Sequence, residues 1–203
     1  MDKIILIGAG GHARACIDVI EMSGQFKIVG LIEKEGTNRQ ENMGYSVIGT
    51  DDDLLNLRQK YSHALVTLGQ IKSPATRIRI FQRLQELDYR FPVIISPRAY
   101  VSKHAQISKG TIVLHDAIVN ANAKVGKNTI INNKALIEHD AFIGDHCHIA
   151  TGAIVNGEVT VGNECFIGSG VVTKHCISIG NNCVIGAGLT LKRDVESNQV
   201  IKN

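Results

Sequence analysis

The sequence predicts a chain in two parts, an α/β domain followed by a prism of very short strands separated by tight corners. Strand-like and helix-like segments alternate as far as Pro92, which is typical of a small parallel sheet with helices on both faces. From Val101 to Leu191, aliphatic residues recur at every sixth position, a period that fits neither a helix nor a continuous strand. All three prolines precede this repeat, so we expect domains at residues 1–95 and 96–203.

The first part of the chain reads as strands and helices in regular succession. Residues 3–7 have the composition of a short buried strand, and residues 13–22 carry apolar side chains at helical spacing. The same criteria predict strands at 27–32 and 64–68, helices at 51–60 and 75–87, and a closing segment at 93–95. This succession supplies little more than one half of a dinucleotide-binding fold, so we expect a Rossmann-like half-domain.

Small residues between the first strand and the first helix form a loose dinucleotide-binding fingerprint. Gly8, Gly10 and Ala13 match the pattern G-x-G-x-x-G/A, which lets the backbone approach a pyrophosphate at the start of a helix. Glu33 follows the second strand closely, where a carboxylate can accept hydrogen bonds from ribose or sugar hydroxyls. A tight turn without any ligand fits the same residues. If a ligand binds, we expect a nucleotide-linked sugar or a related sugar rather than a redox cofactor.

The six-residue repeat is the strongest signal in the sequence. Stepping by six from Val101 passes sixteen positions, of which fifteen are aliphatic and one is Thr173. A small residue, mostly Ala, Thr or Cys, often follows four positions later, so branched and small side chains can fill the inside of a prism. Glycines such as Gly126 and Gly144 come directly after the aliphatic residue, and we expect them to adopt unusual backbone angles at the corners.

Cysteine spacing gives the length of one coil. Cys147, Cys165 and Cys183 lie eighteen residues apart, which is three repeats. We therefore expect their side chains to stack at one inward position of successive coils, packing as small apolar groups. A metal site or a redox relay is the alternative interpretation of the same column.

Composition excludes several classes of function. Lys and Arg exceed Asp and Glu by only three, 22 against 19, and aromatic residues make up 4% with no Trp, which does not favour nucleic-acid binding. No apolar run is long enough to cross a bilayer, and the first apolar stretch ends at Gly8, too early for a signal peptide. Five Cys without CxxC spacing indicate neither a disulfide framework nor a zinc ribbon. We expect a cytoplasmic protein with no membrane or nucleic-acid partner.

The repeat resembles that of the hexapeptide-repeat acyltransferases, whose fold is a left-handed parallel β-helix. The N-terminal module Gly-Ala-Gly-Gly-His-Ala at 8–13, followed by an unbroken repeat, is similar in particular to the NeuD-type sialic acid O-acetyltransferases. That family includes the bacterial UDP-4-amino-sugar N-acetyltransferases. The resemblance implies an α/β Rossmann-like half-domain followed by a left-handed parallel β-helix. It also implies a homotrimer with active sites between neighbouring prisms.

One stretch of the repeat carries this resemblance most specifically. The family pattern has an Asn, then a His seven residues later followed by an acid, then a second His nine residues further on. Here these residues are Asn132, His139, Asp140 and His148. The resemblance implies that Asn132 contacts the substrate, that His139 is the general base and that His148 helps to hold acetyl-CoA. Asp140, or the neighbouring Glu138, would raise the basicity of the imidazole.

The same matching implies further binding residues. The CoA channel is expected to be lined by Gly157, Ser169 and Ala187. The sugar substrate is expected to contact Gly10, Gly11, His12, Glu33, Lys34 and Gly69. The sequence departs from the family pattern at Thr151, where Pro is common. It also lacks a Gly-x-Pro-Ala-Lys tail, which often lies near the CoA site.

The expected chemistry is direct acetyl transfer from acetyl-CoA to a sugar, without a metal. The neutral imidazole of His139 would remove a proton from the attacking group, and a backbone N–H such as that of Gly157 would stabilise the oxyanion. N-acetylation of a UDP-4-amino-sugar is the first expectation, and O-acetylation of sialic acid is the alternative. A γ-carbonic-anhydrase-like metal enzyme would need His139, His146 and His148 to converge, and a non-catalytic sugar-nucleotide binding protein would leave His139 and Asp140 without a role.

Overall fold

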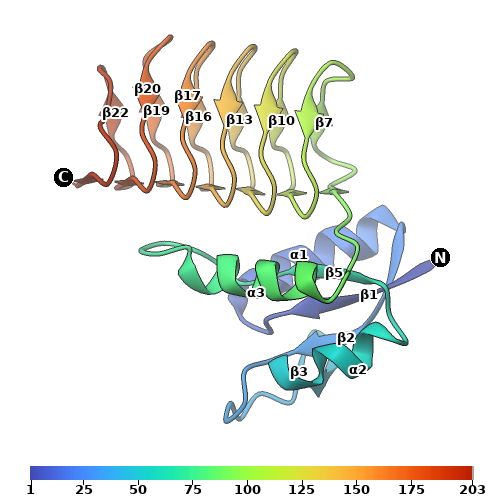
Figure 1. Ribbon diagram of the computed structural model, residues 1–203. Coiled ribbons are helices and arrows are strands. Elements are labelled where there is room, and N and C mark those ends of the chain that lie inside the picture. The colour runs from blue at the N-terminus through green and yellow to red at the C-terminus, as the bar shows by residue number, and fades with distance from the viewer. Residues whose placement is uncertain (203) are drawn as a thin grey trace.

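The N-terminal part of the chain is a five-stranded sheet with helices on both faces (Figure 1). A computed structural model describes residues 1–202. The strands are β1 (Asp2–Ile7), β2 (Phe26–Ile32), β3 (Glu41–Asn42), β4 (Tyr45–Gly49) and β5 (His63–Val66). The helices are α1 (Gly11–Ser23), the 3₁₀ turn η1 (Asp51–Asp53), α2 (Leu54–Arg58) and α3 (Ala75–Glu86). Each strand and helix predicted before Pro92 is present, with small shifts at the ends.

The strand order of this sheet is β3-β4-β2-β1-β5, and only β3 runs antiparallel to its neighbour. No sequence pattern predicted β3 and β4. They are joined at Met43 and Gly44, which have φ values of 50° and 79°. A two-residue turn with both residues in the left-handed region joins antiparallel strands well. Methionine is rare in that conformation, so the sequence signal for this turn is weak.

The interior strand β1, between β2 and β5, is buried on both faces of the sheet, which explains its continuous apolar sequence. Ile4 and Leu6 pack on the side that α1 covers, while Ile5 and Ile7 pack on the side that α2 and α3 cover. Side chains of a strand alternate between faces, so one apolar run serves two cores. Within residues 1–202, no helix combines the length and the apolar character needed to cross a bilayer.

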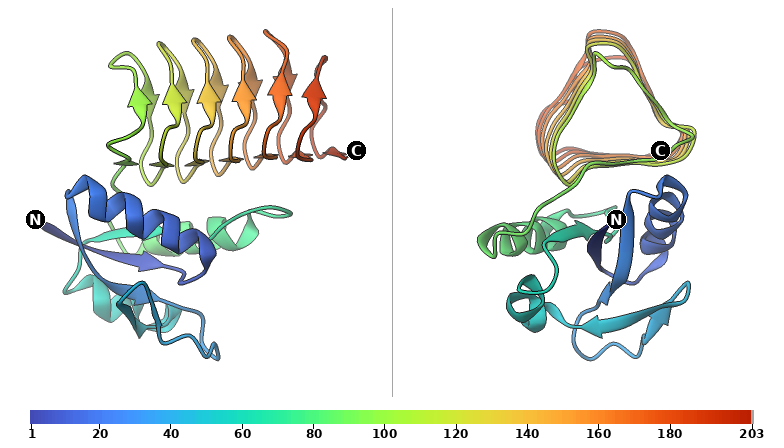
Figure 2. Two further views of the ribbon diagram at one scale, coloured as in Figure 1. Left: turned by 180° about the vertical axis from the view of Figure 1, so that it is seen from behind. Right: turned by 90° about the vertical axis from the view of Figure 1, so that its right-hand side faces the viewer.

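The second part of the chain is a left-handed parallel β-helix with a triangular cross-section (Figure 2). Its base sheet consists of β6 (Ile94–Ile95), β9 (Ile112–Val113), β12 (Ile130–Ile131), β15 (His148–Ile149), β18 (Phe166–Ile167), β21 (Val184–Ile185) and β23 (Val200–Ile201). The first flank sheet consists of β7 (Tyr100–Val101), β10 (Ile118–Val119), β13 (Leu136–Ile137), β16 (Ile154–Val155), β19 (Val172–Thr173) and β22 (Thr190–Leu191). The second flank sheet consists of β8 (Gln106–Ile107), β11 (Lys124–Val125), β14 (Phe142–Ile143), β17 (Thr160–Val161) and β20 (Ser178–Ile179). We call the turns between the two flank sheets the apex.

One coil of the prism contains eighteen residues, as the cysteine spacing predicts. Ile118 pairs with Leu136 in the next coil, and the same offset recurs along each sheet except at the last pair of the base sheet, where Val184 pairs with Val200. Cys147, Cys165 and Cys183 are fully buried inside the prism, in one column. Their thiols point at backbone carbonyls of the following coil; for Cys165 the acceptor is Gly180 O, 3.0 Å from Sγ. The prediction of an inward packing column is confirmed.

The glycines after the aliphatic residues have a different role from the one predicted. The left-handed conformation occurs three positions after the aliphatic residue, for example at Asn128 (φ 49°) and Asp140 (φ 59°). Gly126 and Gly144 do not have positive φ. A Cβ at Gly126 would lie 2.5 Å from the backbone of Gly144 in the next coil. Glycine is therefore required because adjacent coils approach each other closely, and the prediction of unusual backbone angles at these positions is wrong.

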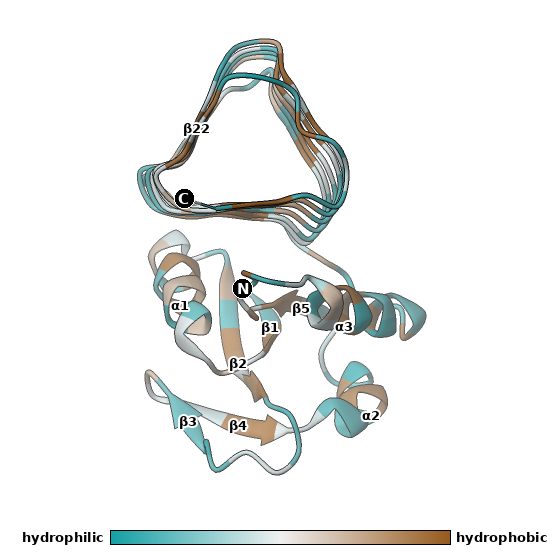
Figure 3. Ribbon diagram, turned by 90° about the vertical axis from the view of Figure 1, so that its left-hand side faces the viewer, coloured by the Kyte–Doolittle hydropathy of each residue, from teal (hydrophilic) through white to brown (hydrophobic). Residues whose placement is uncertain are grey.

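The base sheet of the prism packs on the N-terminal part. Ile94, Ile112 and Ile130 point out of this sheet and join the same apolar cluster as Ile17 and Ile20 of α1. Figure 3 shows the prism end on, with hydrophobic segments along its sides and α1 and α3 beneath its base. Because the base sheet faces the N-terminal part, the apex lies at the opposite edge of the triangle (Figure 2). The first strand of the base sheet, β6, lies at the proposed domain boundary between residues 95 and 96.

Candidate active site

An exposed histidine and an aspartate form a bonded pair at the apex. His139 Nδ1 lies 2.9 Å from Asp140 Oδ2, and the side chains are 50% and 44% exposed. The carboxylate can only accept, so Nδ1 carries the proton and Nε2 keeps a free lone pair. An imidazole in this tautomer presents Nε2 to solvent as a base.

The turn after β13 positions this pair. Asp140 has a left-handed backbone, like the stacked residues Asn122 and Glu158 one coil before and after it. Asn122 Nδ2 donates to Asp140 Oδ1 at 2.5 Å, which fixes the carboxylate from the side away from His139. Glu138 instead accepts from Asn120 Nδ2 and from the His139 amide, so it does not bond to the imidazole. Of the two acids considered from the sequence, Asp140 is the one that holds the ring.

Electrostatics make this imidazole more basic than usual. The hydrogen bond that His139 donates to Asp140 has the largest effect and raises the pKa of His139. Desolvation acts against it, and the charges of Asp140, Glu138 and Glu158 raise the pKa further. The pKa of Asp140 is lowered, first by the hydrogen bond from Asn122 and then by His139. The pair therefore consists of a carboxylate and a ring that gains a proton readily.

Gly157 lies directly against this ring, one coil further along the apex. A Cβ at Gly157 would lie 2.8 Å from both Cε1 and Nε2 of His139. Its φ is not positive, so the requirement for glycine here comes from the neighbouring imidazole. Among residues 1–202 the Gly157 amide has no hydrogen-bond acceptor.

His148 lies on the base sheet, in an environment unlike that of His139. Its Nδ1 lies 2.7 Å from the Gln70 carbonyl oxygen, and its Nε2 lies 3.0 Å from Asn132 Nδ2. The carbonyl can only accept, so Nδ1 is the protonated nitrogen and Nε2 accepts from Asn132. Burial lowers the pKa of His148 to about 4. The structure thus brings Asn132 and His148 together, and both lie away from the apex.

The residues predicted at the start of α1 lie close to His148. Gly10 precedes the helix and Gly11 begins it, with no side chain capping the free N–H groups. The ring of His12 lies 6.3 Å from that of His148, and a Cβ at Gly69 would lie 3.6 Å from His12 Cβ. Burial, Arg77 and His148 together lower the pKa of His12 to about 3.

Glu33 and Lys34 line a cavity of about 230 Å³ at the carboxyl ends of the strands. Ile7, Ile32 and Leu68 form its apolar wall. One oxygen of Glu33 accepts from the Ala9 amide at 3.1 Å, which ties the acid to the glycine-rich turn. This is the edge where open α/β sheets bind ligands.

Ser169 and Ala187 lie together in a larger groove of about 640 Å³ at one edge of the base sheet. Most of the groove is apolar, with Phe166, Val184 and Val200 among its walls. The groove is completed by Ile71 and Lys72 of the β5–α3 loop and by Lys202.

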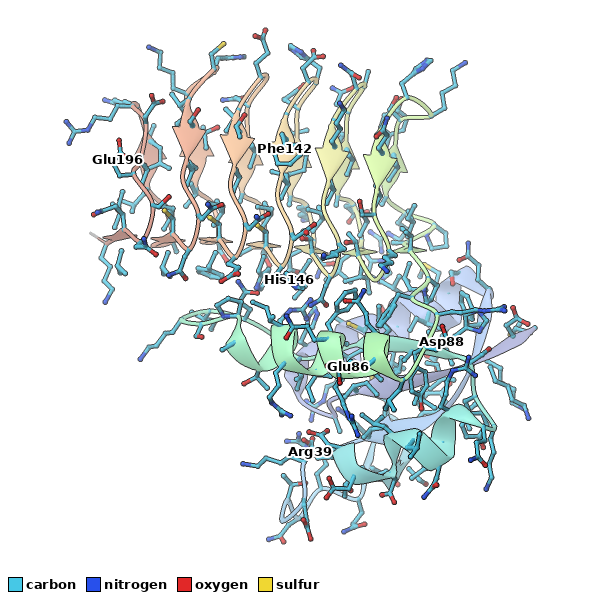
Figure 4. All side chains as sticks on the ribbon, viewed as in Figure 1. Arg39, Glu86, Asp88, Phe142, His146 and Glu196 are labelled. Carbon is cyan, nitrogen blue, oxygen red and sulfur yellow. The ribbon has the colours of Figure 1, made fainter. Side chains whose placement is uncertain are left out.

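The predicted site residues therefore fall into two groups on different edges of the molecule. His139, Asp140 and Gly157 lie at the apex, and the remaining residues lie along the base sheet or in the N-terminal part. The three histidines of the metal-enzyme alternative do not converge. His146 faces the N-terminal part (Figure 4), and so does His148, which bonds to the Gln70 carbonyl. Within the described residues, no group of three or more His, Cys, Asp or Glu side chains is arranged to hold a metal ion.

A layer of buried polar residues between the two parts was not predicted from the sequence. Arg77 is 1% exposed, Gln70 is 3% exposed and Asn128 is fully buried. The available signal was Arg77 itself, since it occupies an apolar position of α3 at helical spacing from Ile80, Phe81 and Leu84. A charged residue at such a position indicates a buried hydrogen-bonding role.

Family profiles match both parts of the chain. The PglD N-terminal domain matches residues 3–84, the bacterial transferase hexapeptide (six repeats) matches residues 140–175, and the hexapeptide repeat of succinyl-transferase matches residues 158–193. No curated protein sequence matches the chain.

Solved structures match over nearly the whole length. A histidine variant of perosamine N-acetyltransferase from Caulobacter crescentus, in complex with CoA and GDP-perosamine, is 25% identical with a TM-score of 0.91, covering 98% of this chain and 93% of that one. The acetyltransferase domain of PglB from Neisseria gonorrhoeae, in complex with acetyl coenzyme A, is 26% identical with a TM-score of 0.91, covering 99% and 96%. WeeI from Acinetobacter baumannii, at 20% identity and a TM-score of 0.83, covers 100% and 97% and shows the shared fold.

The N-terminal profile, the hexapeptide profiles and the full-length structural matches all agree with the two-part fold and with the family resemblance. On these grounds the chain belongs to the PglD/NeuD-type family of hexapeptide-repeat acetyltransferases.

Proposed function

We propose that this protein transfers the acetyl group of acetyl-CoA to the amino group of a nucleotide-linked sugar. The observation that carries the proposal is the exposed apex pair, in which Asp140 holds His139 Nδ1 and leaves Nε2 free beside Gly157. Both 25–26% identical neighbours are named as acetyltransferases, and one of them is bound to CoA and GDP-perosamine.

In this proposal His139 acts as the general base. Its Nε2 takes the proton of the attacking amine while the amine nitrogen bonds to the thioester carbonyl carbon. The carbon–sulfur bond then breaks, and the imidazolium returns the proton to the leaving sulfur. Asp140 stabilises the imidazolium throughout. The Gly157 amide is assigned to the oxygen that becomes negative on the carbonyl.

The charges around His139 favour an amine as the acceptor. Glu138 and Glu158 lie near the ring, and no Lys or Arg of residues 1–202 forms a salt bridge with either acid. A sugar ammonium would be attracted by these carboxylates before it loses its proton, whereas a neutral hydroxyl would gain little. We therefore assign N-acetylation ahead of O-acetylation.

The groove that contains Ser169 and Ala187 suits acetyl-CoA. Its apolar walls can cover the pantetheine arm, and the ammonium groups of Lys72 and Lys202 can pair with phosphates. His148 supports one wall of this groove through its bond to Gln70, which is the role we assign to it toward CoA.

The N-terminal part supplies the proposed site for the nucleotide sugar. Free N–H groups at Gly10 and Gly11 can bind a diphosphate, as helix N-termini do. Glu33 and Lys34 border the adjoining cavity, which we assign to the nucleoside. His12, Gly69 and Asn132 are assigned to the sugar on the side of the base sheet.

A second copy of the chain is needed to complete this site. The apex lies opposite the base sheet, so His139 cannot reach a sugar held by the N-terminal part of its own chain (Figure 2). The first flank sheet offers a surface for that copy, because its outward side chains are Tyr100, Ile118, Leu136, Ile154, Val172 and Thr190. Tyr100 and Ile118 are 59% and 39% exposed. We propose that this apolar row is buried in a homotrimer with each active site between two copies.

A transfer assay tests the activity. Acetyl-CoA is offered with UDP- and GDP-linked amino sugars in one series and with sialic acids in another, and the acetylated product is identified by mass spectrometry. We expect transfer to an amino group of a nucleotide sugar. Transfer to sialic acid hydroxyls alone contradicts the amine assignment, and no transfer in either series contradicts the proposed function. Light scattering should give about three times 22.0 kDa, and a fully active monomer contradicts the shared site.

A further inference from the structure

Arg77 is a buried arginine for which the proposed reaction has no use. It lies near the start of α3 and is 1% exposed. Burial lowers the pKa of its guanidinium to about 10, so the group remains charged at neutral pH. A buried charge is tolerated only where hydrogen bonds replace its hydration. The position of those hydrogen bonds indicates what the residue does.

The guanidinium joins three segments of the chain. Its Nη1 donates to the carbonyl oxygens of Val66, at 3.3 Å, and Leu68, at the end of β5 and just beyond it. Its Nη2 donates to Asn128 of the prism, at 2.8 Å to the backbone oxygen and 2.9 Å to Oδ1. Arg77 therefore fixes the start of the β5–α3 loop relative to both α3 and the prism.

The prism side of this contact is itself fixed by hydrogen bonds and packing. Because Asn128 Oδ1 accepts from Arg77, Asn128 Nδ2 must be the donor to His146 Nδ1, 2.9 Å away. His146 is thus neutral, and burial lowers its pKa to about 4. Its ring packs edge-on against Phe81 of α3, with centroids 5.6 Å apart. Figure 4 shows His146 on the underside of the prism, next to α3.

The loop that Arg77 holds forms a wall of both proposed substrate sites. Gly69 lies against His12 on the sugar side. Two residues later, Ile71 and Lys72 line the groove assigned to CoA. Between them, the Gln70 carbonyl accepts from His148, and Gln70 Nε2 lies 3.4 Å from the Cys165 carbonyl. Residues 68–72 are therefore held by Arg77 at one end and by His148 in the middle.

We propose that Arg77 is a positioning residue that keeps residues 68–72 in the conformation that acetyl-CoA and the sugar nucleotide require. This inference rests on the proposed function. Without the guanidinium, the Val66 and Leu68 carbonyls lose their donor and the loop populates other conformations. The apparent Kd of a ligand then equals its intrinsic Kd divided by the fraction of molecules whose loop is in the binding conformation. The kcat at saturation should be preserved, because bound ligands select the same conformation.

Two substitutions test the proposal, Arg77→Met and Arg77→Lys. Lysine keeps the charge but has a single donor nitrogen in place of the planar guanidinium. It can therefore replace only some of the hydrogen bonds that Arg77 makes. Suppose that about one tenth of the Arg77→Met molecules keep the loop in the binding conformation. The KM for acetyl-CoA and the calorimetric Kd for CoA then rise about tenfold, with a smaller rise in Arg77→Lys. In both variants we expect kcat within about twofold of the wild type. We also expect faster hydrogen exchange at the amide of Thr67, whose bond to the Ile7 carbonyl lies between the two carbonyls that Arg77 holds.

Two matched controls separate positioning from simple stabilisation. Asn128→Gly keeps the left-handed backbone and its carbonyl but removes the side chain, so the melting temperature should fall while KM stays unchanged. Arg83→Gln, at an exposed position of the same helix, should change neither quantity.

A lower melting temperature in both Arg77 variants, with unchanged KM, Kd and hydrogen exchange, would overturn the proposal. If Arg77→Met fails to fold, Arg77→Lys decides by the same readouts. Failure of the proposed function is a separate result, because a wild type without transfer activity still allows the CoA Kd and the exchange rates to be compared.

Discussion

Histidine occurs in two contrasting environments in this chain, at the apex and beneath the base sheet. At the apex, the hydrogen bond that His139 donates to Asp140 and the charges of the neighbouring acids raise the pKa of His139. Beneath the base sheet, burial lowers the pKa of His146 and His148 to about 4. The Nδ1 atom of each ring is hydrogen-bonded within the protein. The first environment suits a group that exchanges protons, and the second suits a fixed contact between two domains. The difference shows that the surroundings of a histidine, rather than its presence in a motif, determine what it can do.

Removing the apex imidazole should have the largest effect. His139→Ala deletes the proposed base but no inward-packed group, so folding and assembly should survive. General-base catalysis contributes about 10²–10⁴-fold, so kcat/KM should fall by at least the lower figure near neutral pH. Steady-state kinetics measure this, with CoA affinity by calorimetry as the control. Near-normal turnover in this variant would place the base elsewhere.

Crowding the same ring should have the next largest effect. In Gly157→Ala the new Cβ would lie 2.8 Å from His139 Nε2, so the imidazole must move. A displacement of this size costs about 10- to 100-fold in kcat/KM. The matched control is the same substitution in the His139→Ala background, where no ring remains to displace and no further loss is expected. An equal loss in both backgrounds would show that Gly157 acts independently of His139.

His146 and His148 should affect how the free energy of unfolding depends on pH, and not turnover. Their folded pKa of about 4 lies below the ordinary value of 6.5, so their contribution to stability is complete above pH 6.5. As the pH falls from 6.5 toward 4, the unfolded chain binds protons that the folded chain excludes. The free energy of unfolding should fall by up to about 1.4 kcal/mol per pH unit for each of the two residues.

Urea unfolding between pH 7.5 and 4.5 measures this slope. His148→Gln keeps a donor for the Gln70 carbonyl but cannot titrate, so it should remove one residue's share of the pH dependence. A slope that is the same in this variant would mean that His148 is not held neutral.

The smallest effect is expected inside the prism. Cys165→Ala removes a fully buried thiol and leaves a small cavity, at a cost of about 1 kcal/mol in the free energy of unfolding. Turnover should be nearly unchanged, because the cysteine column points into the prism, away from both the apex and the underside of the base sheet. Denaturant unfolding and an activity assay check the two parts. Loss of activity in a well-folded variant would contradict the packing role of this column.

The prism was predictable because its pattern is local and repeated. Every sixth residue faces inward and each coil takes eighteen residues, so Val101 to Leu191 and the three cysteines define the fold without long-range information. The role of Gly126 was not predictable in this way. Its need for glycine comes from Gly144 in the next coil, a contact that no local pattern encodes.

The apex pair was likewise within reach of the sequence, because His139 and Asp140 are adjacent and share one turn. The polar layer under the base sheet was not. Arg77, Asn128 and His146 are far apart in the sequence and meet only when the prism docks on α3. The chain also gives no local sign that the apex and the nucleotide site lie on opposite edges, which follows only from the triangular cross-section.

The acid limb of kcat/KM, compared between the wild type and Asp140→Asn, tests the central claim most directly. This limb reports the pKa of the base in the free enzyme. For His139 the inflection should lie above 6.5 in the wild type, and it should move downward in Asp140→Asn because the imidazolium loses its anionic partner. The titration of the sugar amine is the same for both proteins and cannot produce such a shift. An inflection near 4, the value for His148, or a limb that does not respond to Asp140→Asn would contradict the assignment of His139 as the base.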